Sequence, residues 1–126
     1  MAYMRKRTHT QKQKREKPEY EQKLIDLRRV ARVMAGGRRF SFRASLVIGN
    51  RKGDVGFASA KGVDTALAIE KAFKQARKHI IRVPLTKEGS IPHEVFAKHA
   101  GSQLILKPAR RGRGIMAGGP IRVICD

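Results

Sequence analysis

The chain has 126 residues, a length that suits one domain or two very small ones. It carries 29 Lys+Arg against 10 Asp+Glu, and its formal net charge of +19 is self-repulsive until a polyanion such as nucleic acid, an anionic membrane surface or an acidic protein neutralises it. The sequence shows no apolar run near the roughly 18 residues of a membrane span, no apolar stretch typical of a secretory signal, and no second cysteine with which Cys125 could form a disulfide.

The N-terminal part of the chain is basic and then weakly amphipathic. Residues 1–18 hold seven Lys/Arg and almost nothing to bury, which predicts a disordered basic tail. Because the whole chain is so basic, we interpret this tail as a nucleic-acid contact rather than a merely solvated terminus. Residues 19–27 are predicted to form a short helix, because Leu24 and Leu27 are spaced for one helical face.

Three strand-like segments come next, over residues 27–35, 40–49 and 54–60. The second of them alternates apolar and other residues with a period of two, the pattern of a half-buried strand. Gly36-Gly37 and Asn50–Gly53 are predicted as the hairpin turns that join the three strands, since glycine tolerates the positive φ that such turns require.

Residues 64–82 are predicted to form an amphipathic helix that Asp64 or Thr65 caps and Pro84 ends. Its apolar stripe is spaced alternately by three and four residues and consists of Ala66, Ile69, Phe73, Ala76 and Ile80. A second stripe on another face is basic and consists of Lys71, Lys74, Lys78 and Arg82. Glu70 is expected to pair with Lys74, four residues further along the helix.

The rest of the chain is predicted as a linker over residues 84–92, a hairpin of strands 93–98 and 103–107, a glycine-rich loop and the start of a helix. These elements place the chain in the α+β class. In this order of elements, residues 19–83 form an α-β-β-β-α unit.

Basic residues are concentrated between Leu27 and Gly53, a segment that holds eight Lys/Arg and no acid. A solvated surface normally mixes both signs of charge, and small α/β modules hold double-stranded RNA by shape, through its grooves and phosphates. We therefore predict RNA contacts at Arg28, Arg29, Arg32, Gly36, Gly37, Arg38, Arg39, Arg43, Arg51, Lys52 and Lys61. We extend the prediction to Lys71, Lys74 and Lys78, with the alternative that these three form only the solvated face of their helix.

The segment PARRGRGIMAGGP, residues 108–120, lies between a strand and a helix, where phosphate cradles occur. It lacks the Gly-Lys-Ser/Thr ending of a P-loop and the GxGxxG spacing of a dinucleotide site. A nucleotide site is therefore the weaker interpretation. The stronger one is a loop that comes close to RNA or protein backbone, with charge supplied by Arg110, Arg111 and Arg113.

Catalytic and metal-binding constellations are weak in this sequence. The four histidines lack metal-ligand spacing, and His93 and His99 are interpreted as a surface pair across the second hairpin. Cys125 has no evident base partner, and the carboxylates show no paired pattern for acid–base chemistry. We predict that the chain is not an enzyme and needs neither a cofactor nor a metal. Few aromatics, 6% of residues, argue against a large base-stacking platform.

Five blocks occur in the order typical of small-subunit ribosomal protein five: RVARVMAGGRRFSF, GNRKGDVGFASAKG, IEKAFKQARKHIIRVPL, SIPHEV and LKPARRGRGIMAGGPIR. Over residues 22–126 the chain resembles that bacterial family. The resemblance implies a first domain, over residues 19–83, that is similar to double-stranded-RNA-binding domains. It also implies a βαβ-type second domain, present in part over residues 93–126, that is distantly similar to one in small-molecule kinases. It also implies a structural rRNA-binding protein between the body and neck of the small subunit, near the mRNA entry side, beside small-subunit proteins four and eight.

The family's glycine hairpin, which reaches toward the head of the small subunit, matches residues 31–39 of this chain. Two positions differ from the common bacterial pattern there. Ala35 stands where a lysine is usual, and Ala31 stands where a serine is frequent. The family's contact of the tip with phosphate therefore falls to the arginines that follow the glycines.

In the second domain, Gly114 and Arg122 match positions at the interface with protein four, which the family links to decoding accuracy. The usual Gly-Thr-Gly is present here as Gly112-Arg113-Gly114. The family continues beyond Asp126 with the rest of a helix, a strand and another helix. Without these, the inner face of the hairpin at 103–107 is expected to be uncovered.

Together, these observations predict a structural rRNA-binding protein of the small ribosomal subunit, cytoplasmic or in an organelle, that supports subunit assembly and decoding accuracy. A free-standing double-stranded-RNA-binding module acting off the ribosome is the first alternative. A small phosphotransferase that uses the glycine-rich loop is the second.

Overall fold

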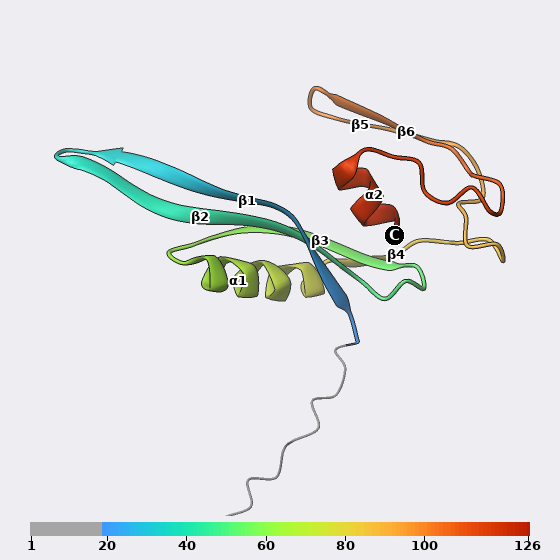
Figure 1. Cartoon of the computed structure of the whole chain (residues 1–126), viewed down its shortest axis with the longest axis horizontal. Coiled ribbons are helices and arrows are strands. Elements are labelled where there is room, and N and C mark those ends of the chain that lie inside the picture. The colour runs from blue at the N-terminus through green and yellow to red at the C-terminus, as the bar shows by residue number, and fades with distance from the viewer. Residues whose placement is uncertain (1–18) are drawn as a thin grey trace, which may run out of the picture.

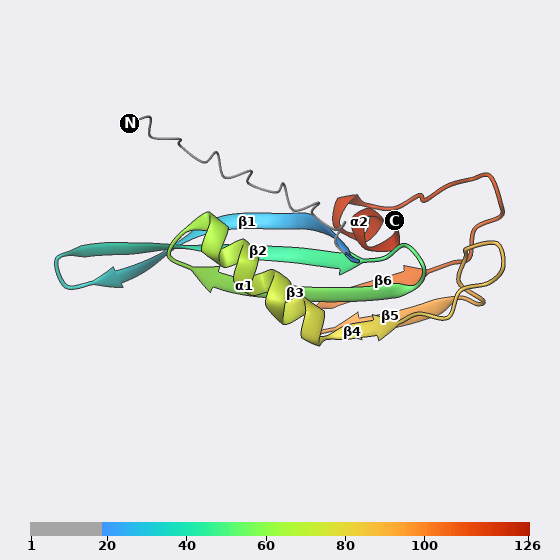
Figure 2. The same ribbon diagram turned by 90° about the horizontal axis from the view of Figure 1, so that it is seen from below.

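The computed structural model describes residues 19–126, so the basic tail predicted over residues 1–18 lies outside the described part. The main sheet is antiparallel, with its strands in sequence order (Figure 1): β1 (Glu21–Met34), β2 (Gly37–Gly49), β3 (Asp54–Gly62) and β4 (Ile80–Arg82). The helix α1 (Thr65–Lys78) connects β3 to β4. It lies across one face of this sheet, which we call the helix face (Figure 2).

The remaining elements are β5 (Val95–His99), β6 (Ser102–Leu106) and α2 (Gly119–Cys125). They lie on the side of the main sheet opposite α1 (Figure 1), and we call that side of the sheet the far face. The predicted second hairpin and the start of a helix after the glycine-rich loop are both confirmed. Within residues 19–126, no helix is long and apolar enough to cross a membrane.

The predicted helix over residues 19–27 is wrong, because this segment belongs to β1. Leu24 lies opposite Leu46 and Leu27 lies opposite Ala44, with a β-bulge just after Leu24. Directly opposed residues share a face of the sheet, and the extra residue of the bulge puts Leu24 and Leu27 on one face although they are three apart. A spacing of three is also typical of one helical face, so the bulge imitates a helical pattern.

The helix predicted over residues 64–82 is correct up to Lys78 and wrong beyond it. The Asp64 carboxylate caps α1 by accepting a hydrogen bond from the Thr65 N–H at 2.7 Å. After the C-cap residue the chain turns into β4, which pairs with the edge of β3 and satisfies backbone groups there. The main unit is therefore β-β-β-α-β rather than α-β-β-β-α.

Small residues bring α1 close to β3. Ala68, Ala72 and Ala76 are each fully buried. A Cβ at Gly56 would lie 2.6 Å from the carbonyl oxygen of Ala76, and a Cβ at Gly62 would lie 2.7 Å from the backbone nitrogen of Ala68. Any larger residue at either glycine would push the helix away from the sheet.

The predicted apolar stripe of this helix is therefore only partly correct. Ala76 is buried as expected, whereas Ala66 is exposed and Ile69 and Phe73 are half-buried at the margin of the core. The alanine stripe packs against β3, and the larger side chains lie toward the start of β1. Leu46 and Ile48 of β2 supply the largest fully buried side chains.

β1 and β2 extend beyond the end of β3. β3 ends at Gly62, opposite Phe42, whereas β1 and β2 stay paired as far as Met34 opposite Gly37. We call residues 30–41 the arm, a two-stranded ribbon that projects from the sheet (Figure 1). The predicted turn is confirmed, with a φ of 89° at Gly36 and 154° at Gly37.

The turn at Asn50–Gly53 is also confirmed, at the other end of β2. The Asn50 side-chain oxygen accepts hydrogen bonds from the backbone N–H groups of Lys52 at 2.8 Å and Asp54 at 3.2 Å. Gly53 has a φ of 110°, and Arg51 adopts a positive φ of 61° as well.

The second unit has little core of its own. The buried residues of the described chain all lie between Ala44 and Ala76, in the main unit. In β5 and β6 the apolar side chains Val95, Phe96 and Ile105 are exposed, as expected for a hairpin with an uncovered face.

Candidate nucleic-acid interface

Three cations lie side by side across the far face of the main sheet. Arg28 of β1 is directly opposite Arg43 of β2, and Arg43 is directly opposite Lys61 of β3. We call these three residues the far-face row. Directly opposed residues have Cβ atoms about 4.5–5.5 Å apart, and like charges in that arrangement destabilise a sheet. An anion that lies over the row would remove this repulsion.

Hydrogen bonds orient this row. The Nε of Arg43 donates to the Ser59 hydroxyl at 3.0 Å, and Ser45 and Ser59 are joined at 3.2 Å. Ser59 is neutral, so it positions the guanidinium without balancing its charge. Arg28 does have a partner, because its Nε lies 2.7 Å from the Asp26 carboxylate.

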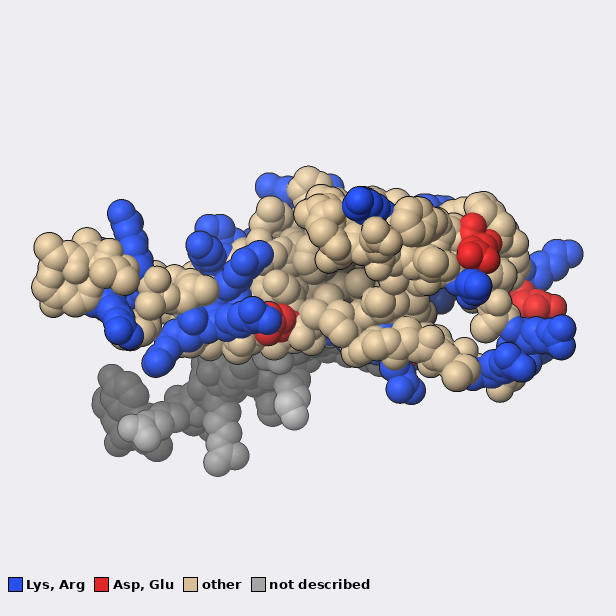
Figure 3. Space-filling view, turned by 90° about the horizontal axis from the view of Figure 1, so that it is seen from above, with Lys and Arg blue, Asp and Glu red and all other residues tan. Residues whose placement is uncertain are grey.

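A second pair of opposed cations lies further out, on the arm. Arg32 faces Arg39 on the continuation of the far face, with Val30 and Ser41 between this pair and the far-face row. Ion pairs in the described part of the chain involve none of Arg32, Arg39, Arg43 and Lys61. Figure 3 shows Lys and Arg side chains along both edges of the arm, at the left of the view, behind a tip that carries none on the visible face.

The opposite side of this ribbon carries Arg29, at the base of the arm, and Arg38, on the arm itself. Both alternate with the far-face residues along their strands. The Arg29 guanidinium lies over the ring of Phe40, with its Cζ 4.5 Å from the ring centroid, a favourable cation–π geometry. Arg38 lies next to the glycine turn, opposite Val33. The arm therefore presents arginines on both of its faces.

The lysines of α1 are not brought together with the far-face row, because α1 covers the helix face. Lys71 and Lys78 are exposed. Lys74 forms the predicted pair with Glu70, with its Nζ 2.6 Å from the carboxylate. The hydrogen bond from Lys74, together with its charge, lowers the pKa of the Glu70 carboxyl below its ordinary value.

Arg51 and Lys52 lie at the end of β2 remote from the arm. The Arg51 guanidinium is 3.2 Å from the Glu21 carboxylate and 3.7 Å from that of Asp126. Lys23 also donates to Asp126. The hydrogen bond from Lys23, and then the charges of Lys23 and Arg51, lower the pKa of Asp126. This cluster joins the end of α2 to the main sheet and already balances the charge of Arg51.

The arginines of the glycine-rich loop are exposed at the end of the molecule opposite the arm (Figure 1). The Arg113 N–H donates to the Arg110 carbonyl at 3.3 Å, and Gly112 and Gly114 have positive φ values of 89° and 68°. Space around Gly114 is open, since an added Cβ would meet nothing within 4 Å.

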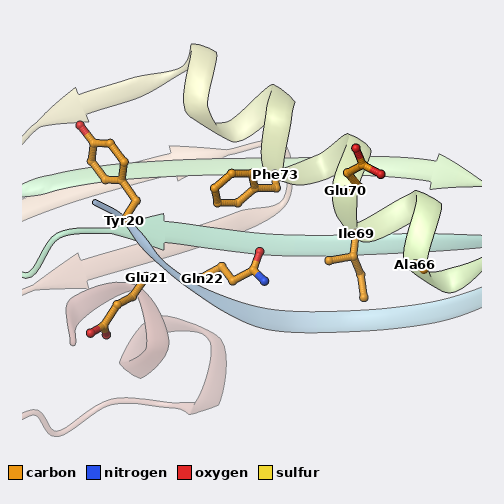
Figure 4. Close-up of a pocket in the computed structure, with 7 residues that line it drawn as sticks. All are labelled: Tyr20, Glu21, Gln22, Ala66, Ile69, Glu70 and Phe73. Atoms are coloured by element: carbon orange, nitrogen blue, oxygen red, sulfur yellow. The ribbon is translucent and has the colours of Figure 1, made fainter. Parts of the chain in front are cut away.

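A shallow apolar groove lies between the start of β1 and α1 (Figure 4), lined by Tyr20, Glu21, Gln22, Ala66, Ile69, Glu70 and Phe73. Its two carboxylates are the ones already paired with Arg51 and Lys74. Residues 19–126 contain no group of three or more histidine, cysteine or acidic side chains that could hold a metal ion.

Sequence reasoning identified the cations but missed two residues that shape the site, Ser59 and Phe40. Ser59 lies diagonally across from Arg43 on the same face of the sheet, because it is two residues before Lys61, the residue directly opposite Arg43. The turn at Asn50–Gly53 fixes the register of β2 and β3, so this neighbour could have been predicted from the sequence. Phe40 begins the alternating pattern over residues 40–49, which is typical of a half-buried strand, but it lies beyond the end of β3 and is half exposed.

Residues 20–84 match the family model described as ribosomal protein S5, N-terminal domain, and residues 97–126 match that described as ribosomal protein S5, C-terminal domain. The chain belongs to the ribosomal protein S5 family. The predicted family resemblance is thereby confirmed.

Several relatives bear the name small ribosomal subunit protein uS5. That of Persephonella marina (strain DSM 14350 / EX-H1) is 48% identical over 106 residues, which cover 84% of this chain and 54% of the relative. That of Mesomycoplasma hyopneumoniae (strain 7448) is 42% identical over 113 residues, or 90% of this chain and 52% of the relative. That of Nostoc punctiforme (strain ATCC 29133 / PCC 73102) is 38% identical over 126 residues, or 100% of this chain and 71% of the relative. The chain thus spans about half the length of the first two relatives.

Proposed function

We propose that the chain is a structural rRNA-binding component of the small ribosomal subunit and performs no catalysis. Membership of the ribosomal protein S5 family supports this function. The observation that carries it is the far-face row, Arg28, Arg43 and Lys61. In the free protein Arg43 lies between two like charges, of which only Arg28 has an acidic partner, Asp26. A polyanion with closely spaced phosphates would convert the remaining repulsion into attraction.

The arm extends this surface. Glycines at its tip let an RNA backbone come close, and Arg38 and Arg39 hold phosphate just behind the tip, a task that falls to them because position 35 is alanine. We keep Arg51 outside the proposed contact set because two carboxylates, those of Glu21 and Asp126, already lie against it. Arg28 stays in the set because it has a single partner, Asp26, and lies directly opposite another cation. The proposed RNA contacts are Arg28, Arg29, Arg32, Gly36, Gly37, Arg38, Arg39, Arg43, Lys52 and Lys61, with Lys71, Lys74, Lys78, Arg110, Arg111 and Arg113 as peripheral ones.

Protein neighbours belong to the same proposal. Small-subunit proteins four and eight are the expected ones, with Gly114 and Arg122 facing protein four. The open space around Gly114 and the exposure of Arg122 suit such a contact. Through it the chain would support subunit assembly and decoding accuracy near the mRNA entry side. The proposal also treats residues 19–83 and residues 93–126 as two separate domains.

Co-sedimentation with small subunits tests the location. The chain should move with the small subunit in a sucrose gradient at moderate salt. Recovery only among free proteins would refute the ribosomal function and favour the alternative, a double-stranded-RNA-binding module that acts off the ribosome.

RNA titrations test the interface itself. The logarithm of the affinity should fall with the logarithm of salt concentration by roughly 0.7 to 0.9 for each phosphate contact. Arg38→Ala should weaken binding to all RNA sequences alike, and Arg51→Ala, with its charge already balanced, is the matched control. A flat salt response would contradict the proposed interface.

A further inference from the structure

Phe40 is the one phenylalanine of the arm, residues 30–41, and lies against a planar cation. The side chain is 49% exposed. It lies on the continuation of the helix face, and the Arg29 guanidinium covers part of its ring with Cζ 4.5 Å from the centroid. A flat aromatic surface and a flat cationic surface therefore lie together in solvent.

The hydrophobic core does not account for this position. β3 ends opposite Phe42, so Phe40 lies where the sheet has only two strands. The core cluster consists of Leu46 and Ile48 of β2 together with alanines of β3 and α1, and Phe40 is not part of it. An apolar ring in that position gains little from burial in the free chain.

We propose that Arg29 and Phe40 form a stacking site for a single unpaired RNA base. This inference rests on the proposed function and specifies which kind of RNA structure the arm binds, namely one with an unpaired base. Bases in an RNA duplex hide their faces in the helical stack, whereas bases in bulges, loops and ends can stack on aromatic rings or guanidinium planes.

The charges around the pair select RNA over a protein partner. Arg32, Arg38 and Arg39 lie on the same arm, and the segment from Leu27 to Gly53 contains no acid. An apolar protein segment would satisfy the ring and leave these charges unbalanced. A nucleotide satisfies both, because its base covers the ring while the phosphates on either side of it reach the arginines.

The test uses two RNA duplexes of about 16 base pairs, the length that a double-stranded-RNA-binding domain spans. One is fully paired, and the other carries a single bulged 2-aminopurine, whose fluorescence falls on stacking. The full chain is compared with Phe40→Leu, Phe40→Tyr and Arg29→Lys. Phe57→Leu is the matched control, because Phe57 is 53% exposed on the far face.

The full chain should bind the bulged RNA on the order of tenfold more tightly than the paired one, the value of one stacked base, and should quench the probe. Phe40→Leu should abolish both the preference and the quenching while its affinity for the paired duplex stays unchanged. Phe40→Tyr and Phe57→Leu should keep both, and Arg29→Lys should lose part of the preference because lysine has no planar group.

Equal affinity of the full chain for the two RNAs would overturn the stacking site, as would quenching that survives in Phe40→Leu. An equal loss by Phe40→Leu on both RNAs would assign the ring a structural or backbone-contacting role and would overturn it too. Absence of salt-dependent binding to either RNA would instead refute the proposed RNA-binding function, so the two failures are distinguishable.

Discussion

Arg43 is the central cation of the far-face row, and replacing it with glutamine separates its effect on the free protein from its effect on RNA binding. Glutamine keeps a polar side chain beside Ser59 but removes the charge. The substitution eliminates two like-charge contacts at once, with Arg28 on one side and with Lys61 on the other.

The size of the effect follows from the position of the row on the sheet. A directly opposed pair changes stability by about 0.2–1 kcal/mol, and exposed charges lie toward the low end. We therefore expect Arg43→Gln to raise the free energy of unfolding of the free chain by roughly 0.5–1 kcal/mol at low salt. The gain should vanish in about 1 M salt, where charges are screened within about 3 Å.

Urea unfolding at about 10 mM and about 1 M salt measures this difference. Titration with a paired RNA duplex should show the opposite effect, with weaker binding and a salt slope smaller by roughly 0.7 to 0.9. Arg51→Gln is the control, since it loses its contacts with Glu21 and Asp126 and gains no relief from repulsion. A gain of equal size at both salt concentrations, or destabilisation at low salt, would refute the argument.

Two further predictions concern the packing of the helix and the junction with α2. Gly56→Ala should destabilise the chain by about 1–3 kcal/mol in urea unfolding, because its Cβ would lie 2.6 Å from the Ala76 carbonyl oxygen. Gly101→Ala is the control and should change the stability little, because the space around Gly101 is open. Similar losses of stability for both variants would contradict the packing account. The lowered pKa of Asp126 means that its ionised form stabilises the folded chain above its ordinary pKa, about 4, and that this contribution disappears as the pH falls from there through the lowered value. Lys23→Gln should move the pKa of Asp126 back toward that ordinary value in an NMR titration, and an unchanged pKa would mean that Lys23 is not its main partner.

The parts of the fold that could be predicted are those with an unbroken local pattern. β2 alternates with a period of two, α1 has an evenly spaced apolar stripe, and the turns carry glycines at positive φ. β1 was missed over its first residues because a bulge restores Leu24 and Leu27 to one face at helical spacing. β4 is only three residues long, too short for a pattern, and exists because the edge of β3 offers it backbone partners.

The same distinction holds for the candidate site. The block of cations was evident from the sequence. The residues that face each other across β1 and β2 follow from the position of the turn, because residues equally far from Ala35-Gly36 are opposed, as Arg32 and Arg39 are. The balance of Arg51 was not accessible in this way, since its partner Asp126 is far away in the sequence. Local patterns report which charges are present, and only the tertiary structure reports which of them are already paired.

The arm connects stability with function. A two-stranded ribbon is marginally stable by itself in water, and opposed arginines at Arg32 and Arg39 weaken it further. Extra protein packing would stabilise the arm but would cover the faces that carry the cations and Phe40. Phosphates that bind between the opposed cations remove the repulsion within the arm and add attraction to it. Under the proposed function, RNA binding and ordering of the arm would therefore be one coupled step, with RNA supplying the layer that the protein does not.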